Sequence, residues 1–406
     1  MRFRDIISLC VVLLSGCTTH SALYEWEKGR DGLRPVSDMA ICYGGHSARN
    51  PYLWTPERFS STVSYVDTCG REHWLFDNML MMEIWTDDYQ VTYSIANDGR
   101  RSSDKENWVE LLDYWFDDEY GFAALDECIS QTVSRIGEPP FKRGVVFALP
   151  DPVYFEHYTD AMKGINDKTV YWGSVESDMG ADSSLDFSKV EDRLKAYIWM
   201  VNQVRARFAA AGYRRIELIG FYVLSEELSF PGSFRYEYKE HDRLIPALAD
   251  YCHSVNEALF WVPYAMAPGV ERWREYGFDM CVMQPNIYWE NPRFTWEQIG
   301  QALDEYGLGM ELEFEGTHGE PQNSSILSRL SGGDINPYAD ANRGRFLEYL
   351  DFAREKGIYG TRPFVLYSGT DALRELAISR ENEDMEVYHR LCSFIIENPL
   401  KDNTYE

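Results

Sequence analysis

The chain has 406 residues, of which 45% are apolar and 26% are charged, so it can bury a large core and is not a disordered protein. Its 66 acidic and 39 basic residues give a formal charge of −27, which repels both phosphate backbones and anionic lipid headgroups. We therefore expect no nucleic-acid partner and no membrane contact through a basic patch. Aromatic residues reach 15%, enough to line a cleft as well as a core.

The beginning of the chain has the pattern of an export signal. An apolar run from Ile6 to Leu14 follows two arginines and is too short to cross a bilayer as a helix. The next residues, Leu14-Ser15-Gly16-Cys17, resemble the bacterial lipobox, whose cysteine becomes lipidated. The resemblance implies a signal peptide over 1–16, a lipid on Cys17, a polar tether over 17–36 and a lipoprotein of the cell envelope, at the outer membrane or cell surface. An ordinary signal peptide with a chance cysteine is the alternative.

Eight short β-rich runs, each bounded by turn residues, alternate with helical patterns along the chain. Eight strands that alternate with helices predict a parallel sheet, and eight strands close a (β/α)8 TIM barrel. A doubly wound open sheet would normally carry a glycine-rich phosphate turn after its first strand, and Tyr43-Gly44-Gly45-His46 lacks that spacing. The predicted strands are Met39–Tyr43, Asn78–Trp85, Gly144–Leu149, Arg215–Val223, Ala258–Tyr264, Met280–Gln284, Gly309–Phe314 and Pro363–Tyr367.

We expect a single barrel domain over residues 37–400, because neither a repeat nor a linker divides it. The clearest helix is Ser188–Ala211, in which apolar residues recur at spacings of three and four. Other helices are predicted, among them Pro56–Thr68 and Val270–Tyr276. Long loops are expected after the second, third and seventh strands, at the face where barrels carry their active sites. They span about residues 86–107, 150–187 and 316–341.

Glutamates occupy one face of the seventh predicted strand. Three of them alternate with three apolar residues, Glu311, Glu313 and Glu315 against Met310, Leu312 and Phe314. A barrel strand packs its outer face on helices, so the apolar set is predicted to point outward and the glutamates inward. Burying carboxylates is costly unless they are paired. A structural network is the alternative, above all for Glu311, the deepest, whereas Glu313 and Glu315 favour a functional role.

The fourth predicted strand runs directly into Glu226 and Glu227 where the chain leaves the sheet. An exposed loop pair is the alternative, but the ends of this strand and of the seventh share the barrel mouth. Glycoside hydrolysis needs two carboxyl groups that flank the bond, one protonated to donate to the leaving oxygen and one ionised to attack or to activate water. A separation of about 5–5.5 Å gives retention, and about 6.5–9.5 Å gives inversion.

A glutamate after strand four and another at the end of strand seven resemble the arrangement in retaining TIM-barrel glycoside hydrolases. That resemblance implies Glu226 as the general acid/base and Glu313 as the nucleophile. Glu227 and Glu315 are the alternatives, because a bulge would exchange the two faces of a strand. Ser225 stands where these enzymes usually carry an asparagine before the acid/base.

The chain is also similar to an uncharacterised family of bacterial secreted barrel proteins, domain of unknown function 4855. The similarity rests on four segments as a set, G-F-Y-x-x-x-E (Gly220–Glu226), F-W-V-P-Y (Phe260–Tyr264), G-F-D-x-x-x-x-Q-P-N-x-Y (Gly277–Tyr288) and M-E-L-E-F (Met310–Phe314). It covers most of the chain from the first strand to the eighth, and it implies the barrel fold.

Polar and aromatic residues at the other strand ends are candidates for binding a sugar. Amides both donate and accept hydrogen bonds, and aromatic rings stack on sugar rings. For each aromatic residue alone, a place in the core is the alternative. The candidates are Tyr43, Glu83, Tyr222, Trp261, Tyr264, Gln284, Asn286, Tyr288 and Tyr367, with His46 and Trp85 as weaker ones.

Other chemistries have little support in the sequence. The six cysteines after Cys17 are scattered without a CxxC, so a thiolate metal site is not expected, and their disulfide pairing is not given. No HExxH, P-loop or GxSxG motif occurs. Asp334, Asn336 and Asp340 match a calcium loop only in part. We expect neither a metal nor a cofactor.

These observations together predict a monomeric, exported glycoside hydrolase that acts on a neutral poly- or oligosaccharide, since the mouth lacks a clear basic clamp for an anion. Its only membrane contact would be the N-terminal lipid. A non-catalytic glycan-binding lipoprotein on the same scaffold is the alternative, because a fold does not decide function. A lyase or another sugar-acid enzyme is a third, weaker reading.

Overall fold

The computed structural model of the protein describes residues 36–44, 53–86, 91–94, 101–153, 172, 185–233, 236–289, 292–316, 339–369 and 371–403. The signal peptide over 1–16, lipidation at Cys17, nearly all of the tether and the candidate His46 lie outside these residues and stay predictions. The three long loops lie outside them in part.

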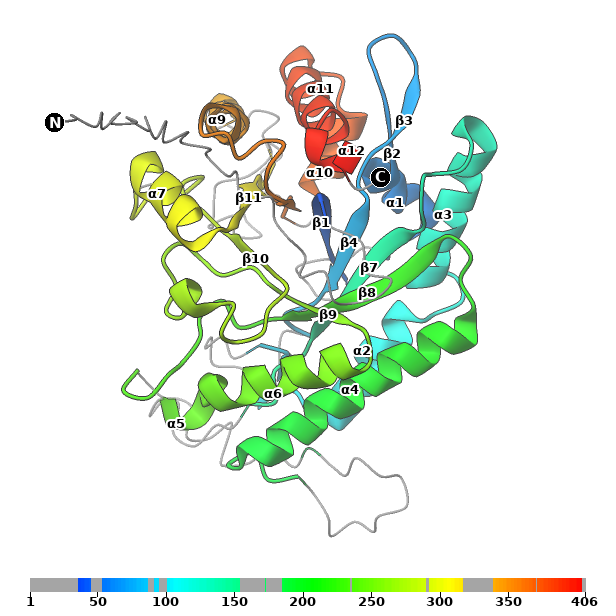
Figure 1. The fold of residues 1–406 in the computed structure, drawn as a ribbon. Coiled ribbons are helices and arrows are strands. Elements are labelled where there is room, and N and C mark those ends of the chain that lie inside the picture. Colours follow the sequence, from blue (N-terminus) through cyan, green and yellow to red (C-terminus); the bar gives the residue numbers. More distant parts are fainter. Residues whose placement is uncertain are drawn as a thin grey trace, which may run out of the picture.

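The eight predicted strands are all present and close a parallel barrel (Figure 1). Their order around the barrel is β1-β12-β11-β10-β9-β8-β7-β4, which confirms the (β/α)8 fold. Nearly every residue of these strands is buried, as expected when side chains fill the barrel inside and helices cover it outside. The strands are β1 (Asp38–Tyr43), β4 (Asn78–Met82), β7 (Arg143–Leu149), β8 (Ile216–Val223), β9 (Ala258–Trp261), β10 (Met280–Met283), β11 (Gly309–Glu313) and β12 (Phe364–Tyr367).

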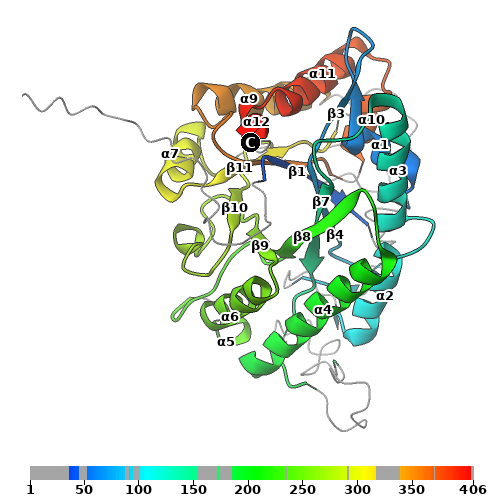
Figure 2. The same ribbon diagram turned by 45° about the vertical axis from the view of Figure 1, so that its right-hand side comes forward.

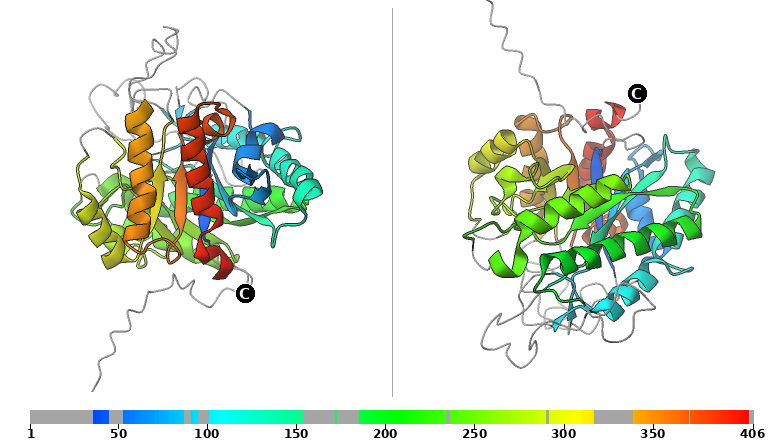
Figure 3. Two further views of the ribbon diagram at one scale, coloured as in Figure 1. Left: turned by 90° about the horizontal axis from the view of Figure 1, so that it is seen from above. Right: turned by 60° about the horizontal axis from the view of Figure 1, so that its bottom comes forward.

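Helices surround the barrel, and α9 and α11 run alongside the strands in the left view of Figure 3. Figure 2 shows α1 beside α3 and α4 beside α6, and both pairs are in contact. None of the helices in the described ranges combines the length and the hydropathy needed to cross a bilayer. The helices are α1 (Pro56–Val63), α2 (Lys105–Trp115), α3 (Gly121–Ile136), α4 (Val190–Ala211), α5 (Tyr236–Lys239), α6 (His241–Ser254), α7 (Trp296–Tyr306), α9 (Ala339–Glu355), α10 (Ala372–Ile378), α11 (Asn382–Ile396) and α12 (Pro399–Asn403).

Two helix predictions need correction. The first predicted helix ends at Val63 rather than Thr68, because the chain turns there into a hairpin of β2 (Ser64–Val66) and β3 (Glu72–Trp74). The carboxylate of Asp67 closes the hairpin by accepting hydrogen bonds from two backbone N–H groups across the turn. The predicted helix Val270–Tyr276 is only a short 3-10 turn, Val270–Arg272.

Strand β8 contains a bulge that decides which of its side chains face the barrel interior. Val145 of β7 pairs with Leu218 and Val146 with Gly220, so one residue of β8 has no partner on β7. A Cβ atom on Gly220 would lie 2.3 Å from the carbonyl oxygen of Ala258, so only glycine fits. Beyond the bulge, the strand places Tyr222 in the interior, where it lies within electrostatic reach of Glu226 and Glu311.

A buried charge cluster closes the N-terminal end of the barrel. Lys401 of α12 places its Nζ 3.0 Å from Asp38 and 3.4 Å from Asp77. Arg143 lies 2.7 Å from the same Asp77 carboxylate, and all four side chains are buried. The last helix therefore ties together the first residues of β1 and β7 and the residue that precedes β4. This network lies at the end of the barrel opposite the mouth.

Candidate active site

Glu313 is the last residue of β11 and points into the barrel. Its neighbour Phe314 packs on Phe346 of α9 with ring centroids 4.9 Å apart, so the apolar set faces the helices as predicted. Alternation then directs Glu311 and Glu313 inward, where both side chains are buried.

Three hydrogen bonds hold the carboxylate of Glu313. Oε2 accepts the hydroxyl of Tyr349 and, at 2.8 Å, the backbone N–H of Asn286, and Oε1 accepts Nδ2 of Asn286 at 3.2 Å. Burial raises the pKa of Glu313 to about 7 although the bonds from Tyr349 and Asn286 lower it, and the charge of Glu226 adds to the increase. The carboxylate can therefore gain or lose a proton near neutral pH.

Glu226 lies in the turn after β8 and is exposed. Its Oε1 accepts Nε2 of Gln284 at 2.9 Å, and the same Nε2 also donates to the Val262 carbonyl at 3.0 Å. Oε1 of Gln284 in turn accepts Nδ2 of Asn286 at 3.4 Å. Because Asn286 also binds Glu313, the two amides link the two carboxylates along the barrel rim.

Asn286 is fixed in this link by its backbone as well as by its side chain. It adopts a left-handed conformation with φ of 53°, which asparagine tolerates better than most residues. Its Oδ1 accepts the N–H of Ala265 at 3.0 Å, and this contact turns Nδ2 toward Glu313. Gln284 and Asn286, which the sequence predicts to bind substrate, therefore also form hydrogen bonds to Glu226 and Glu313.

Glu311 lies one inward position below Glu313 and completes a group of three glutamates. Burial, together with the charges of Glu313 and Glu226, raises its pKa well above the ordinary value. Burial therefore favours the protonated form of Glu311, which would limit the negative charge inside the barrel.

The alternative glutamates have different surroundings. Glu227 is half-buried and forms an ion pair with Lys239 at 2.5 Å and a hydrogen bond from Tyr264 at 2.8 Å. Burial raises its pKa, but the contacts with Lys239 and Tyr264 together outweigh burial, so the net shift is downward. Glu315 is also half-buried and accepts the hydroxyl of Tyr367 at 2.6 Å.

A further carboxylate that the sequence reading missed supports the turn carrying Glu226. Asp151, just after β7, is buried and accepts the Ser225 hydroxyl at 3.1 Å and the Tyr197 hydroxyl at 2.8 Å. The indole N–H of Trp261 donates to the Ser225 carbonyl at 2.6 Å. Both contacts fix the residue before Glu226. A polar residue two positions after a strand was the signal available for Asp151.

Tyr349 was missed as well, and it lies on α9 rather than at a strand end. Its place in a helix with ordinary spacing of apolar residues gives no sequence signal for a site role. Only the packing of α9 against β11 brings its hydroxyl to Glu313.

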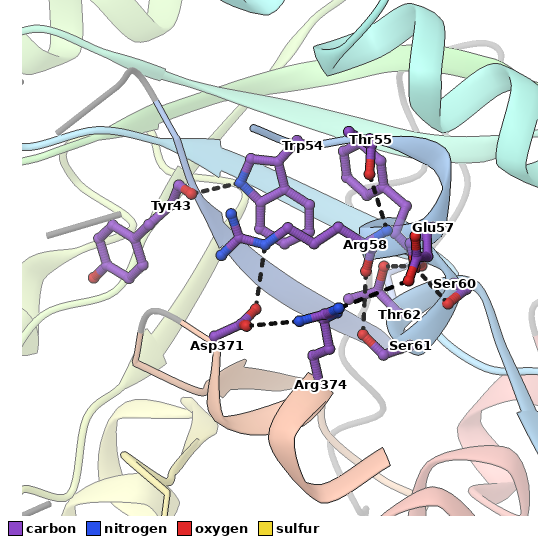
Figure 4. Close-up of polar contacts among 11 residues, drawn as sticks. Tyr43, Trp54, Thr55, Glu57, Arg58, Ser60, Ser61, Thr62, Asp371 and Arg374 are labelled. Carbon is purple, nitrogen blue, oxygen red and sulfur yellow. Dashed lines mark hydrogen bonds and ion pairs between the residues drawn. The ribbon is translucent and has the colours of Figure 1, made fainter. Parts of the chain in front are cut away.

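Tyr43 and Tyr367 lie side by side at the ends of neighbouring strands β1 and β12, with ring centroids 6.1 Å apart. The backbone carbonyl of Tyr43 accepts the indole N–H of Trp54 at 2.5 Å. The ring of Tyr43 points away from α1 (Figure 4). The guanidinium of Arg58 stacks on Trp54 at 4.4 Å and pairs with Asp371 at 3.2 Å. These contacts fix the rim where the barrel closes.

The remaining candidates are placed as follows. Glu83 is buried, and one oxygen accepts the N–H groups of Ile84 and Trp85, so it shapes the turn after β4. Trp261 is fully buried and stacks on Phe278 at 5.2 Å, which makes it part of the core under the site. Tyr288 is also fully buried, and its hydroxyl donates to the Gly316 carbonyl at 3.4 Å.

Among the described residues, no group of three or more His, Cys, Asp or Glu side chains is arranged to hold a metal ion. The buried Glu311 and Glu313 and the exposed Glu226 belong instead to one cluster, which is connected by hydrogen bonds and by electrostatic interactions.

Solved structures that are similar to this chain include several enzymes. A D-allulose 3-epimerase from Methylomonas sp. is 10% identical, with 90% of this chain and 99% of that chain covered and a TM-score of 0.38. A putative alpha-L-fucosidase from Bacteroides thetaiotaomicron is 12% identical over 90% and 95%, with a TM-score of 0.40. The catalytic domain 2 of a group II chitinase from Ostrinia furnacalis is 9% identical over 90% and 97%, with a TM-score of 0.41.

No curated protein matches the sequence. A family model matches residues 38–393, from the first residue of β1 into α11, and so includes all eight barrel strands. The chain therefore belongs to the family described as domain of unknown function DUF4855.

Proposed function

We propose that this protein is a glycoside hydrolase that cleaves a neutral poly- or oligosaccharide with two glutamates. One observation carries the proposal: Glu226 and Glu313 come from two different strand ends, lie within electrostatic reach of each other and are joined through Gln284 and Asn286. A pair of carboxyl groups at the mouth of a barrel is the arrangement that glycosidic bond cleavage requires.

The surroundings of the two glutamates support different roles for them. Glu313 is held by three donors, which offset part of the rise in its pKa caused by burial and fix its orientation, as a nucleophile requires. Glu226 is exposed, so it can reach both a leaving-group oxygen and solvent protons, as an acid/base requires. In the reaction, Glu313 would bond to the anomeric carbon while Glu226 donates its proton to the departing oxygen. Water activated by Glu226 would then release the sugar with net retention.

Two cations near the mouth are already paired with carboxylates, which favours a neutral substrate over an anionic one. Lys239 is neutralised by Glu227, and Arg58 by Asp371. Their charges are therefore already balanced within the protein. The glutamate cluster would also repel a sugar acid, so hydroxyl groups are the features that Gln284, Tyr264 and Tyr367 are suited to bind.

The proposal is tested with a panel of neutral oligosaccharides and aryl glycosides, assayed with the wild type, Glu226→Gln and Glu313→Gln. We expect Glu313→Gln to lose at least about a thousandfold in kcat on every substrate. Glu226→Gln should lose far more on natural substrates than on aryl glycosides, whose leaving groups need little protonation. Proton NMR of the first product should show the retained anomer.

Glu227→Gln is the matched control, because it removes a neighbouring carboxylate that is already bound to Lys239. Undiminished turnover in both Glu226→Gln and Glu313→Gln would refute the assignment. Tight binding of a glycan by the wild type without turnover would favour the non-catalytic alternative.

A further inference from the structure

The hydroxyl of Tyr349 connects two elements at the mouth. It accepts the backbone N–H of Ile287 at 3.1 Å and that of Tyr288 at 2.8 Å, both in the turn after β10. It donates to Oε2 of Glu313 at the end of β11. One side-chain oxygen on α9 thus joins the turn to the carboxylate.

These contacts determine the direction of the hydrogen bond to Glu313. A tyrosine hydroxyl has one proton to donate and two lone pairs to accept with. Two N–H groups already occupy the acceptor positions, so the proton is directed to Oε2. Burial and the charge of Glu313 raise the pKa of Tyr349 well above its ordinary value, so the hydroxyl keeps this proton. Tyr349 is therefore a permanent donor.

The two oxygens of Glu313 consequently differ. Oε2 accepts two donors, Tyr349 and the N–H of Asn286. Among the described residues, Oε1 accepts one donor, Nδ2 of Asn286. Oε2 is thus the oxygen by which the protein holds the carboxylate, and Oε1 keeps more capacity to react.

Packing makes Tyr349 rigid enough to orient another group. Its ring lies edge-on against Trp296 of α7 with centroids 4.8 Å apart, and the side chain is fully buried. One turn earlier on α9, Phe346 packs on Phe314, the residue that follows β11. Helix α9 therefore packs directly against the end of the strand that carries Glu313.

We propose that Tyr349 is a positioning residue for Glu313, which holds Oε2 and orients the carboxylate for attack through Oε1. The inference rests on the proposed function for its kinetic consequence, but the contact itself does not. The inference gives Tyr349 a role in the site although this residue lies on a helix of the barrel and not at a strand end.

The test is a ¹³C NMR titration of the Glu313 carboxyl in the wild type and in Tyr349→Phe, assigned with Glu313→Gln. Loss of a hydrogen bond to a charged group should raise the pKa of Glu313 by about one to two pH units. Tyr288→Phe is the matched control, because it removes another buried hydroxyl that contacts the Gly316 carbonyl rather than Glu313. An unchanged titration in Tyr349→Phe, or an equal shift in the control, would overturn the inference.

A second variant keeps the hydroxyl and so protects the test against misfolding. 3-Fluorotyrosine at position 349 has a more acidic phenol and donates more strongly, so the pKa of Glu313 should fall rather than rise. On a glycoside that the wild type cleaves, Tyr349→Phe should lower kcat by about tenfold or more with little change in KM, and should move the acidic limb of the pH profile upward. If the titration shifts but no glycoside is cleaved, the proposed function fails and the positioning contact stands.

Discussion

At the scale of single residues, Glu313 shows how burial of a reactive group acts on stability. Its pKa is raised from 4.5 to about 7 by burial, so the native state keeps a proton that the unfolded chain releases between these values. The free energy of unfolding therefore falls as the pH rises through this window. The unfavourable burial of the charged form is the physical cause.

Glu313→Gln removes this titration. We expect the stability of the variant relative to the wild type to increase by about 3 kcal/mol between pH 4 and pH 8. Urea unfolding at a series of pH values measures it, with Glu275→Gln as a control on an exposed carboxylate paired with Arg272. A stability difference independent of pH would contradict the prediction.

At the scale of elements, the conformation of the turn after β8 depends on a contact from the end of the neighbouring strand β7. Asp151, two residues after β7, holds the hydroxyl of Ser225, the residue that precedes Glu226. If this contact supports the turn, the effects of Asp151→Asn and Ser225→Ala on the free energy of unfolding should not be additive. We expect a coupling energy of about 0.5–3 kcal/mol in the double-mutant cycle.

The same cycle with Ser188→Ala, an exposed residue remote from Asp151 in the sequence, gives the control. Additivity within about 0.5 kcal/mol for Asp151 and Ser225 would show that the turn is held by other contacts. Turnover offers a second readout, because a displaced Glu226 should lower kcat on poor leaving groups first.

Elements with a strong local pattern were predictable from the sequence. The eight strands and the inward face of β11 follow from alternation and from turn residues, and these place Glu226 and Glu313 at one mouth. The hairpin of β2 and β3 was missed, because the side chain of Asp67 competes with helical hydrogen bonds. The role of Tyr349 depends on a contact between residues far apart in sequence, which no local pattern encodes.

At the scale of the whole molecule, the barrel separates the end that provides stability from the end that carries the glutamates. Lys401 offsets the buried carboxylates of Asp38 and Asp77 at the end opposite the mouth. Removing one partner of a buried ion pair leaves an uncompensated charge, so Lys401→Met should lower the free energy of unfolding at pH 7 by about 3–5 kcal/mol. Burial raises the pKa of Asp38, and losing Lys401 raises it further.

This direction of shift predicts how the penalty depends on pH. As the pH falls, Asp38 becomes protonated in the folded variant, the buried charge disappears and the difference from the wild type should shrink. Adding Asp38→Asn to Lys401→Met should likewise recover part of the loss at pH 7, since the pair is then removed together. Urea unfolding of the three proteins at pH 4 and pH 7 measures both effects.

A loss at pH 7 below about 0.5 kcal/mol would contradict the prediction, because surface substitutions commonly cost that little. Turnover by the variant under conditions where it stays folded should match the wild type, since α12 contacts the strand ends that lie away from Glu226 and Glu313.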